Sequence, residues 1–254
     1  MPSIALVLEF DGTDFVGWQI QDNGRSVQEA VQTALSELYK EDIKVTGSSR
    51  TDAGVHARGM VCSAKVPFNI PADKLPLACN ALLPPDVAVV RAIDVSEGFN
   101  ARFDSLGKRY VYRIVHDRVR HPLLCRYAHF VTGRLDVEAM KEAAACFAGE
   151  HDFAAFCAAG GSQNTTVRRL RSVEVLADEQ TGVIEIEVTG EAFLYNMVRI
   201  IAGTLLYVGQ GKIAAGDIPA VIESRDREKA GKTLPPEGLT LEEVFYAPDL
   251  HINP

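Results

Sequence analysis

The sequence lacks any apolar stretch long enough to cross a lipid bilayer, although hydrophobic residues make up 47% of its 254 positions. Its N-terminal segment also lacks the basic region and the small-residue cleavage site of a signal peptide, and its apolar run is interrupted at Glu9. These absences predict a cytoplasmic protein. A chain of this length can bury one large hydrophobic core or two smaller ones.

Paired cysteines and the common metal or nucleotide motifs are missing as well. The five cysteines are an odd number and none has C-x-x-C spacing, which is typical of reduced thiols in an intracellular protein. Cys146 and His151 are the nearest approach to a zinc site, but they lack a second pair of ligands. H-E-x-x-H and G-x-S-x-G are absent, and the glycines of residues 54–59 are followed by Met-Val rather than the Lys-Ser/Thr of a phosphate loop.

The chain also lacks a net positive charge. Its net charge of −8 argues against a generally basic nucleic-acid-binding protein. Basic residues are nevertheless concentrated between 102 and 134, where only Asp104 and Asp117 oppose them, and a second group lies at 168–171. The central group, called here the basic belt, comprises Arg102, Lys108, Arg109, Arg113, Arg118, Arg120, Arg126 and Arg134. The belt is either a local binding surface for a polyanion or an ordinary solvated surface.

Hydrophobic periodicity predicts two halves with the same order of elements, β-α-β-β-α-β. In the first half, strands are expected at 3–10, 42–47, 59–66 and 86–95, with helices at 26–40 and 71–83. In the second half, strands are expected at 127–132, 170–177, 182–190 and 241–246, with helices at 136–149 and 192–209. A further strand is expected between the halves, within residues 102–115.

Capping residues support two of these helices. Ser26 followed by Glu29 has the pattern of a capping box, and Asp136 is expected to cap the next half's first helix, with Gly149 ending it. The predicted fold is therefore α+β, with two ferredoxin-like halves at 1–103 and 104–254. We expect the halves to form a joined antiparallel or mixed sheet with a cleft between them, because such a cleft is a common place for a binding site.

The stretch SSRTDAGVHARG at 48–59 contains one carboxylate, Asp52, between glycines. The guanidinium of Arg50, two residues earlier, favours the ionised form of that carboxylate. Asp52 could therefore act as a nucleophile or a base. The same residue types are common in ordinary turns, where an aspartate bonds to its own backbone.

A pair of tyrosines and one arginine each allow a chemical and a structural interpretation. Tyr110 and Tyr112 alternate in a basic strand, so their side chains share one face, and a tyrosine there could stack on a planar base or simply pack in a sheet. Arg199 lies in the most apolar predicted helix. A buried guanidinium needs a partner, for which Asp52 is a candidate, unless the side chain extends to water.

Seven stretches together resemble the tRNA pseudouridine synthase A family, which isomerises uridine in the anticodon arm of tRNA. The stretches run in family order from end to end, and the heptad RTDAGVH is highly specific. They are FDGTDFVGWQIQ (10–21), RTDAGVHARG (50–59), NALLPPDV (80–87), FNARFDSLGKRYVYRI (99–114), GEHDFAAF (149–156), FLYNMVRIIAGTLLYVG (193–209) and EGLTLEEVFY (237–246).

The resemblance implies a role for each matching residue. Asp52 matches the catalytic aspartate, Tyr110 matches the tyrosine that stacks on the target uracil, and Arg50 and Arg199 match arginines that position the aspartate. Leu239 matches an apolar residue of the pocket floor. A segment expected to touch tRNA comprises Phe99, Asn100, Ala101, Arg102 and Phe103. Three positions depart from the family pattern, namely Phe10 for tyrosine, Asn100 for histidine, and the additional acid Asp104, which we expect to weaken phosphate attraction nearby.

The resemblance also implies the pseudouridine synthase fold, a homodimer, no cofactor or metal, and target uridines at tRNA positions 38 to 40. Two rival functions remain open. One is an RNA-binding module without catalytic activity, and the other is a hydrolase with an aspartate nucleophile, which normally has a second carboxylate or a metal nearby.

Overall fold

The computed structural model describes residues 1–161 and 164–252. The chain forms two compact units, the first comprising Met1–Gly107 together with the residues from Thr240 onward, and the second comprising Lys108–Leu239. Both units combine helices with a sheet, which confirms the α+β class. None of the helices in the described residues has the length and apolar character needed to span a bilayer.

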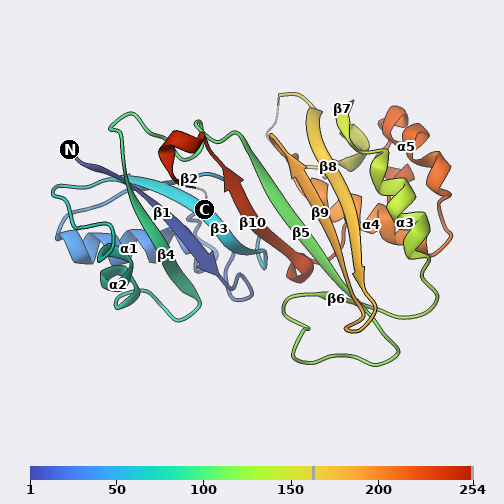
Figure 1. Ribbon diagram of the computed structural model, residues 1–254, viewed down its shortest axis with the longest axis horizontal. Coiled ribbons are helices and arrows are strands. Elements are labelled where there is room, and N and C mark those ends of the chain that lie inside the picture. Colours follow the sequence, from blue (N-terminus) through green and yellow to red (C-terminus); the bar gives the residue numbers. More distant parts are fainter. Residues whose placement is uncertain (162–163, 253–254) are drawn as a thin grey trace. The chain divides into compact units, whose positions relative to one another are not determined.

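The first unit has the predicted β-α-β-β-α-β order. Its central strands are antiparallel and lie in the order β4–β1–β3, with the short β2 antiparallel to β3 (Figure 1). This is the strand order of a ferredoxin-like fold. The elements are β1 (Ser3–Phe10), α1 (Val27–Tyr39), β2 (Val45–Gly47), β3 (His56–Lys65), α2 (Leu75–Asn80) and β4 (Val87–Val95).

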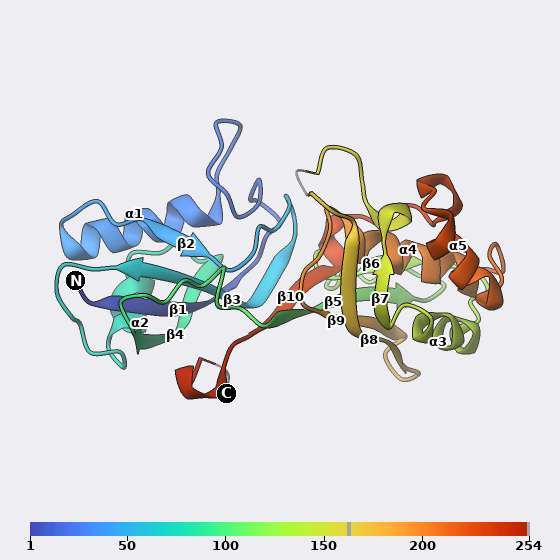
Figure 2. The same cartoon turned by 90° about the horizontal axis from the view of Figure 1, so that it is seen from above.

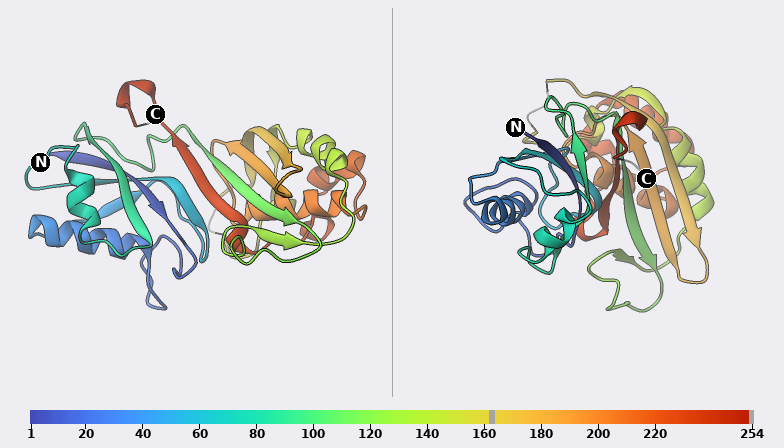
Figure 3. Two further views of the ribbon diagram at one scale, coloured as in Figure 1. Left: turned by 60° about the horizontal axis from the view of Figure 1, so that its bottom comes forward. Right: turned by 60° about the vertical axis from the view of Figure 1, so that its left-hand side comes forward.

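Helix α1 forms where the sequence predicts it because one face is apolar and both ends are capped. Val27, Val31 and Leu35 are buried, and the Ser26 side chain accepts a hydrogen bond from the backbone N–H of Glu29 at 3.3 Å. Lys40 then adopts a left-handed conformation and ends the helix. The two helices of this unit contact each other and lie side by side in the right-hand view of Figure 3.

A fifth strand, β10 (Leu239–Phe245), pairs in parallel with the beginning of β3, with Thr240 opposite His56. At Gly59 the two strands approach so closely that a Cβ atom would lie 2.3 Å from the Glu242 carbonyl oxygen. The sequence assigned the whole of 104–254 to the second half. In the structure, the residues from Thr240 onward belong to the first unit, because β10 pairs with β3.

The second unit contains a four-stranded antiparallel sheet in the order β5–β9–β8–β7, with β6 parallel to β5. Helix α3 packs on β8 and on α4 (Figure 2). The elements are β5 (Gly107–His116), β6 (His129–Val131), α3 (Val137–Ala145), β7 (Gly149–Asp152), β8 (Val167–Asp178), β9 (Val183–Gly190), α4 (Met197–Gly209) and α5 (Ile218–Ser224).

Three predictions in this unit need correction. The sequence predicted residues 127–132 as the first strand of the second half. In the structure this strand is only the three residues of β6, and the long strand paired with β9 is β5. Helix α4 begins at Met197 rather than at 192, because Asn196 has a left-handed conformation that ends the preceding turn. Helix α3 is capped by Asp136 as predicted, but it ends at Ala145, and Gly149 instead opens β7 with a positive φ.

Candidate active site

The Asp52 loop, residues 48–55, joins β2 to β3 and is docked on the segment 10–21. Asp52 is half-buried and forms an isolated β-bridge with Gly17. On either side of it, the Trp18 N–H donates to the Thr51 carbonyl at 3.1 Å, and the Gly54 N–H donates to the Phe15 carbonyl at 3.3 Å. Backbone atoms on both sides of Asp52 therefore hold it against the segment 10–21.

Two glycines of the segment 10–21 make this docking possible. Gly17 has a φ of +112°, and a Cβ atom there would lie 2.4 Å from the Thr51 carbonyl oxygen. A Cβ atom on Gly12 would lie 2.0 Å from the Val55 carbonyl oxygen. Both positions therefore require glycine for the segment 10–21 to dock on the Asp52 loop.

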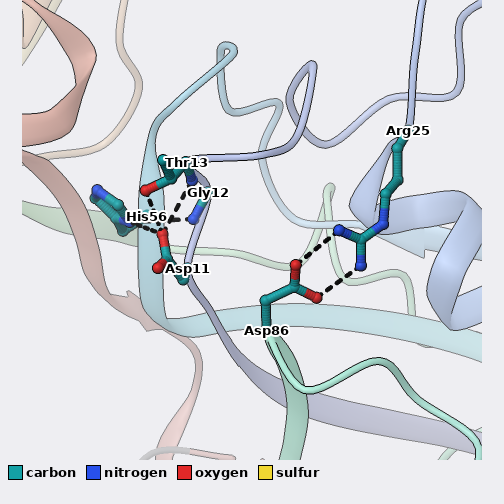
Figure 4. A network of polar contacts seen from close by, with 6 residues as sticks. All are labelled: Asp11, Gly12, Thr13, Arg25, His56 and Asp86. Atoms are coloured by element: carbon teal, nitrogen blue, oxygen red, sulfur yellow. Dashed lines mark hydrogen bonds and ion pairs between the residues drawn. The ribbon is translucent and has the colours of Figure 1, made fainter. Parts of the chain in front are cut away.

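An ion pair fixes the far side of the same segment. The guanidinium of Arg25 donates through Nη1 and Nη2 to the two carboxylate oxygens of Asp86, at 2.7 Å each (Figure 4). The same guanidinium lies 4.2 Å from the ring centre of Phe15, whose carbonyl oxygen binds the loop at Gly54. The hydrogen bond to Asp86 raises the pKa of Arg25.

We expect Arg25→Lys to lower the free energy of unfolding by about 0.5–1 kcal/mol, because an ammonium cannot make the paired bonds to Asp86 or stack equally well on Phe15. The expected loss is small because the Arg25 side chain is 43% exposed. Urea unfolding at low salt measures it. Arg58→Lys is the matched control, since Arg58 has a longer 3.7 Å contact to Glu242 and is 60% exposed. Equal losses in the two variants would contradict the prediction.

Tyr110 lies on β5 of the second unit and is buried. Its ring packs edge-to-face on Phe193, with ring centres 5.1 Å apart. Tyr112, two residues on, is fully buried and donates its hydroxyl to the Pro235 carbonyl at 2.8 Å. Burial raises the pKa of the Tyr112 hydroxyl. The two tyrosines thus have different neighbours, and Tyr112 is held as a structural hydrogen-bond donor.

Arg199 lies on the apolar helix α4 and is half-buried. Its guanidinium therefore needs hydrogen-bond partners within the protein. Its Nε donates to the Leu234 carbonyl at 2.7 Å and its Nη1 donates to Asn196 Oδ1 at 2.6 Å. The positive charge of Arg199 also acts on Glu237, a carboxylate of the same unit. Burial pushes the pKa of Glu237 up, but a hydrogen bond from His129, a backbone hydrogen bond and the charges of His129 and Arg199 together hold this pKa below its usual value. The pairing of Arg199 with Asp52 stays a prediction.

The remaining predicted site residues lie in three places. Arg50 is exposed in the Asp52 loop, and Leu239 is buried at the start of β10. The segment 99–103 forms a turn in which Asn100 Oδ1 accepts hydrogen bonds from the N–H groups of Arg102 and Phe103, at 2.9 and 3.2 Å.

Asp104 closes this turn. Its carboxylate accepts a hydrogen bond from the Asn100 N–H at 2.7 Å. Ala101 is buried and anchors the turn through bonds to Ser63 and Tyr246, whereas Phe103 is 78% exposed with the Arg102 guanidinium 5.7 Å from its ring centre. The two departures from the family pattern, Asn100 and Asp104, therefore cap a turn that projects Arg102 and Phe103 outward.

Comparison with known proteins identifies the family of the chain. The model of the family described as tRNA pseudouridine synthase matches residues 6–104 and 143–247. This chain belongs to the tRNA pseudouridine synthase family. The matched residues include the Asp52 loop and Arg199, whereas Tyr110 falls between the two matched stretches.

Curated relatives named tRNA pseudouridine synthase A match over nearly the whole chain. Those of Ruminiclostridium cellulolyticum and Caldicellulosiruptor bescii are 48% and 44% identical over 246 residues, which cover 97% of this chain and 100% of each relative. That of Geobacter sp. (strain M21) is 45% identical over 247 residues, covering 97% and 99%. A crystal structure of a Cbf5–Nop10–Gar1 complex covers 81% of this chain and 54% of its own at 17% identity, with a TM-score of 0.32, a likeness too low to carry a conclusion.

Residue-level reasoning from the sequence missed Gly12, Gly17, Arg25, His56 and Asp86, all of which hold the Asp52 loop or its neighbours in place. The position of the two glycines could have indicated their role. Both lie in the connection between β1 and α1, where a glycine often marks a tight turn or a close backbone contact. The Arg25–Asp86 pair spans 61 residues of sequence, and no local pattern reveals it.

Proposed function

We propose that this chain isomerises uridine to pseudouridine at positions 38 to 40 in the anticodon stem-loop of tRNA, with Asp52 as the catalytic carboxylate. The observation that carries the proposal is the RTDAGVH loop, held by backbone contacts to FDGTDFVGW, in a chain that is 48% identical over 97% of its length to a curated tRNA pseudouridine synthase A. A fixed carboxylate is what this reaction requires.

The reaction breaks the bond between ribose C1′ and uracil N1 and forms a bond between C1′ and C5. The uracil must first leave the base stack, which costs a few kcal/mol. Stacking on an aromatic ring returns roughly 1–3 kcal/mol per base, and Tyr110 is our proposed platform. Asp52 could attack C1′, add to C6 of the base, or remove a ribose proton to give a glycal. All three routes require the ionised carboxylate, which Arg50 and Arg199 would favour.

The detached uracil must rotate and reattach without water intercepting the sugar, so the site has to be dry. Leu239, which is buried, is our proposed contributor to an apolar floor. Loss of the C5 proton needs a base late in the reaction, and Tyr110 is the candidate. None of these roles requires a metal or a cofactor.

Binding of the tRNA is assigned to the basic belt and to the turn 99–103. Arg102 and Phe103 are both exposed, and this combination suits a phosphate contact next to a base or ribose contact. Phosphate contacts spread over several arginines supply most of the affinity for a polyanion, despite the net charge of −8. We further propose that the working unit is a cytoplasmic homodimer, in which the basic belt of one protomer helps hold a tRNA bound at the other.

Release of tritium from tRNA labelled at uracil C5 tests the activity, because the C5 proton is lost when C5 bonds to ribose. We expect the purified protein to release tritium from transcripts with uridine at position 38, 39 or 40, and not from transcripts with cytidine at all three. Retention of tRNA without release would indicate an RNA-binding module. Appearance of free uracil would indicate a hydrolase.

A further inference from the structure

His56 is the last residue of the RTDAGVH heptad and the first residue of β3. It is 3% exposed, and its backbone lies opposite Thr240 of β10 in the parallel register. A buried imidazole has to be satisfied by hydrogen bonds. The partner of the His56 imidazole therefore indicates which segment of the fold this side chain holds in place.

The imidazole accepts a hydrogen bond from the segment that follows β1. The Gly12 N–H donates to His56 Nδ1 at 3.0 Å, a hydrogen bond that requires the tautomer with an unprotonated Nδ1. The Asp11 carboxylate lies 3.3 Å from the same nitrogen, but Asp11 Oδ1 accepts hydrogen bonds from the N–H and the hydroxyl of Thr13 at 3.0 and 2.6 Å (Figure 4). His56 therefore serves as an acceptor, and it fixes the peptide of Gly12.

Gly12 in turn contacts the Asp52 loop. It packs so closely on the Val55 carbonyl that no Cβ atom would fit, and the Val55 N–H donates to the carbonyl oxygen of Asp52 at 3.2 Å. The sequence of contacts runs from His56 Nδ1 to the Gly12 peptide, from there to Val55, and from Val55 to Asp52. All of these residues lie within the first unit.

We propose that His56 is a positioning residue for Asp52, acting as a hydrogen-bond acceptor that holds the Gly12 peptide against the Asp52 loop. This inference rests on the proposed function. Without the acceptor, the buried N–H of Gly12 would be left unsatisfied and would turn toward another partner. The Asp52 loop would then lose the surface on which Val55 is packed. A displacement of about 1 Å at a catalytic group is sufficient for a large loss of rate.

Two substitutions of His56 separate an acceptor from mere packing. His56→Asn places Oδ1 where histidine has Nδ1 and keeps the acceptor, whereas His56→Leu places a methyl group there and keeps the apolar bulk. With labelled tRNA, we expect His56→Leu to lower kcat for tritium release about tenfold or more, with KM within about twofold of the original. His56→Asn is expected to keep kcat within about threefold.

Trp18 provides a readout that does not depend on activity. It is the only tryptophan in the chain and is 3% exposed. Its backbone N–H donates to the carbonyl oxygen of Thr51, beside Asp52. Displacement of the Asp52 loop should therefore increase quenching of its fluorescence by acrylamide. We expect the increase in folded His56→Leu and not in His56→Asn.

Equal kcat values for the two variants, a loss confined to KM, or unchanged Trp18 quenching in His56→Leu would overturn the proposal. Absence of tritium release from the unaltered protein would refute the proposed function instead, and Trp18 quenching would still decide whether His56 holds the loop. If His56→Leu fails to fold, His56→Gln replaces it, because glutamine moves the acceptor one methylene beyond Gly12. A His56→Gln variant as active as His56→Asn would then overturn the proposal.

Discussion

Replacing Asp52 with asparagine is expected to lower the rate of tritium release from C5-labelled tRNA by about 1,000-fold or more, while tRNA affinity stays within about threefold. The rate falls because asparagine has nearly the same shape but cannot act as a nucleophile or a base. Affinity survives because it comes mainly from phosphate contacts distributed over many basic residues. Single-turnover tritium release measures the first quantity, and filter binding at a stated salt concentration measures the second.

The structure makes this substitution informative, because asparagine keeps the shape of aspartate and the backbone contacts of Thr51, Asp52 and Gly54 that hold the loop. Asp52→Asn should therefore unfold at the same temperature as the original protein. Asp22→Asn is the matched control, since Asp22 is exposed in the same N-terminal region and should retain full activity. An Asp52→Asn variant that released tritium at the original rate would remove Asp52 from the mechanism.

Local signals in the sequence predicted most individual elements correctly. Strand β1 has the predicted bounds, and helices α1 and α3 begin at the predicted capping residues Ser26 and Asp136. These signals are readable because a cap and an apolar face depend on residues only three or four positions apart. The resemblance then identified the family, which the family model and the curated relatives confirm.

Features that depend on distant parts of the chain could not be predicted in the same way. Strand β10 pairs with β3 of the first unit, although Ala57 and Leu241 lie 184 positions apart in the sequence. The register of such a pair is set by packing and not by the local sequence. The beginning of α4 depends on the left-handed conformation of Asn196, which the apolar run around it conceals.

The candidate site shows the same division. The sequence pointed to Asp52 from its neighbours, but it did not show that Gly12, Gly17 and His56 hold the loop, because these contacts exist only after β1 and β3 have paired. Arg199 was expected to need a partner. Two of its hydrogen bonds go to neutral oxygens of Leu234 and Asn196, an arrangement that depends on the path of the chain after α5.

The largest expected effect on stability is that of Gly203→Ala in α4. A Cβ atom at this position would lie 1.8 Å from the Lys232 carbonyl oxygen, and this obstacle is backbone that cannot rotate away. Helix α4 and the segment 230–234 are also joined by hydrogen bonds here. Thr204 Oγ1 accepts one from the Gly231 N–H at 2.8 Å, and the Leu234 N–H donates to the Arg199 carbonyl. The added methyl group must therefore separate two segments that are bonded to each other.

Helix propensity alone predicts the opposite result, because alanine in a helix is favoured over glycine by about 1 kcal/mol. We expect the steric term to dominate and the free energy of unfolding to fall by about 3 kcal/mol, the upper part of the range for overpacking. A loss of that size lowers the unfolding temperature by roughly 6–12 °C. Gly216→Ala is the control, because no atom lies within 4 Å of its Cβ position. Thermal unfolding followed by circular dichroism decides between the two terms, and a Gly203→Ala variant as stable as Gly216→Ala would show that α4 can withdraw from the 230–234 segment without cost.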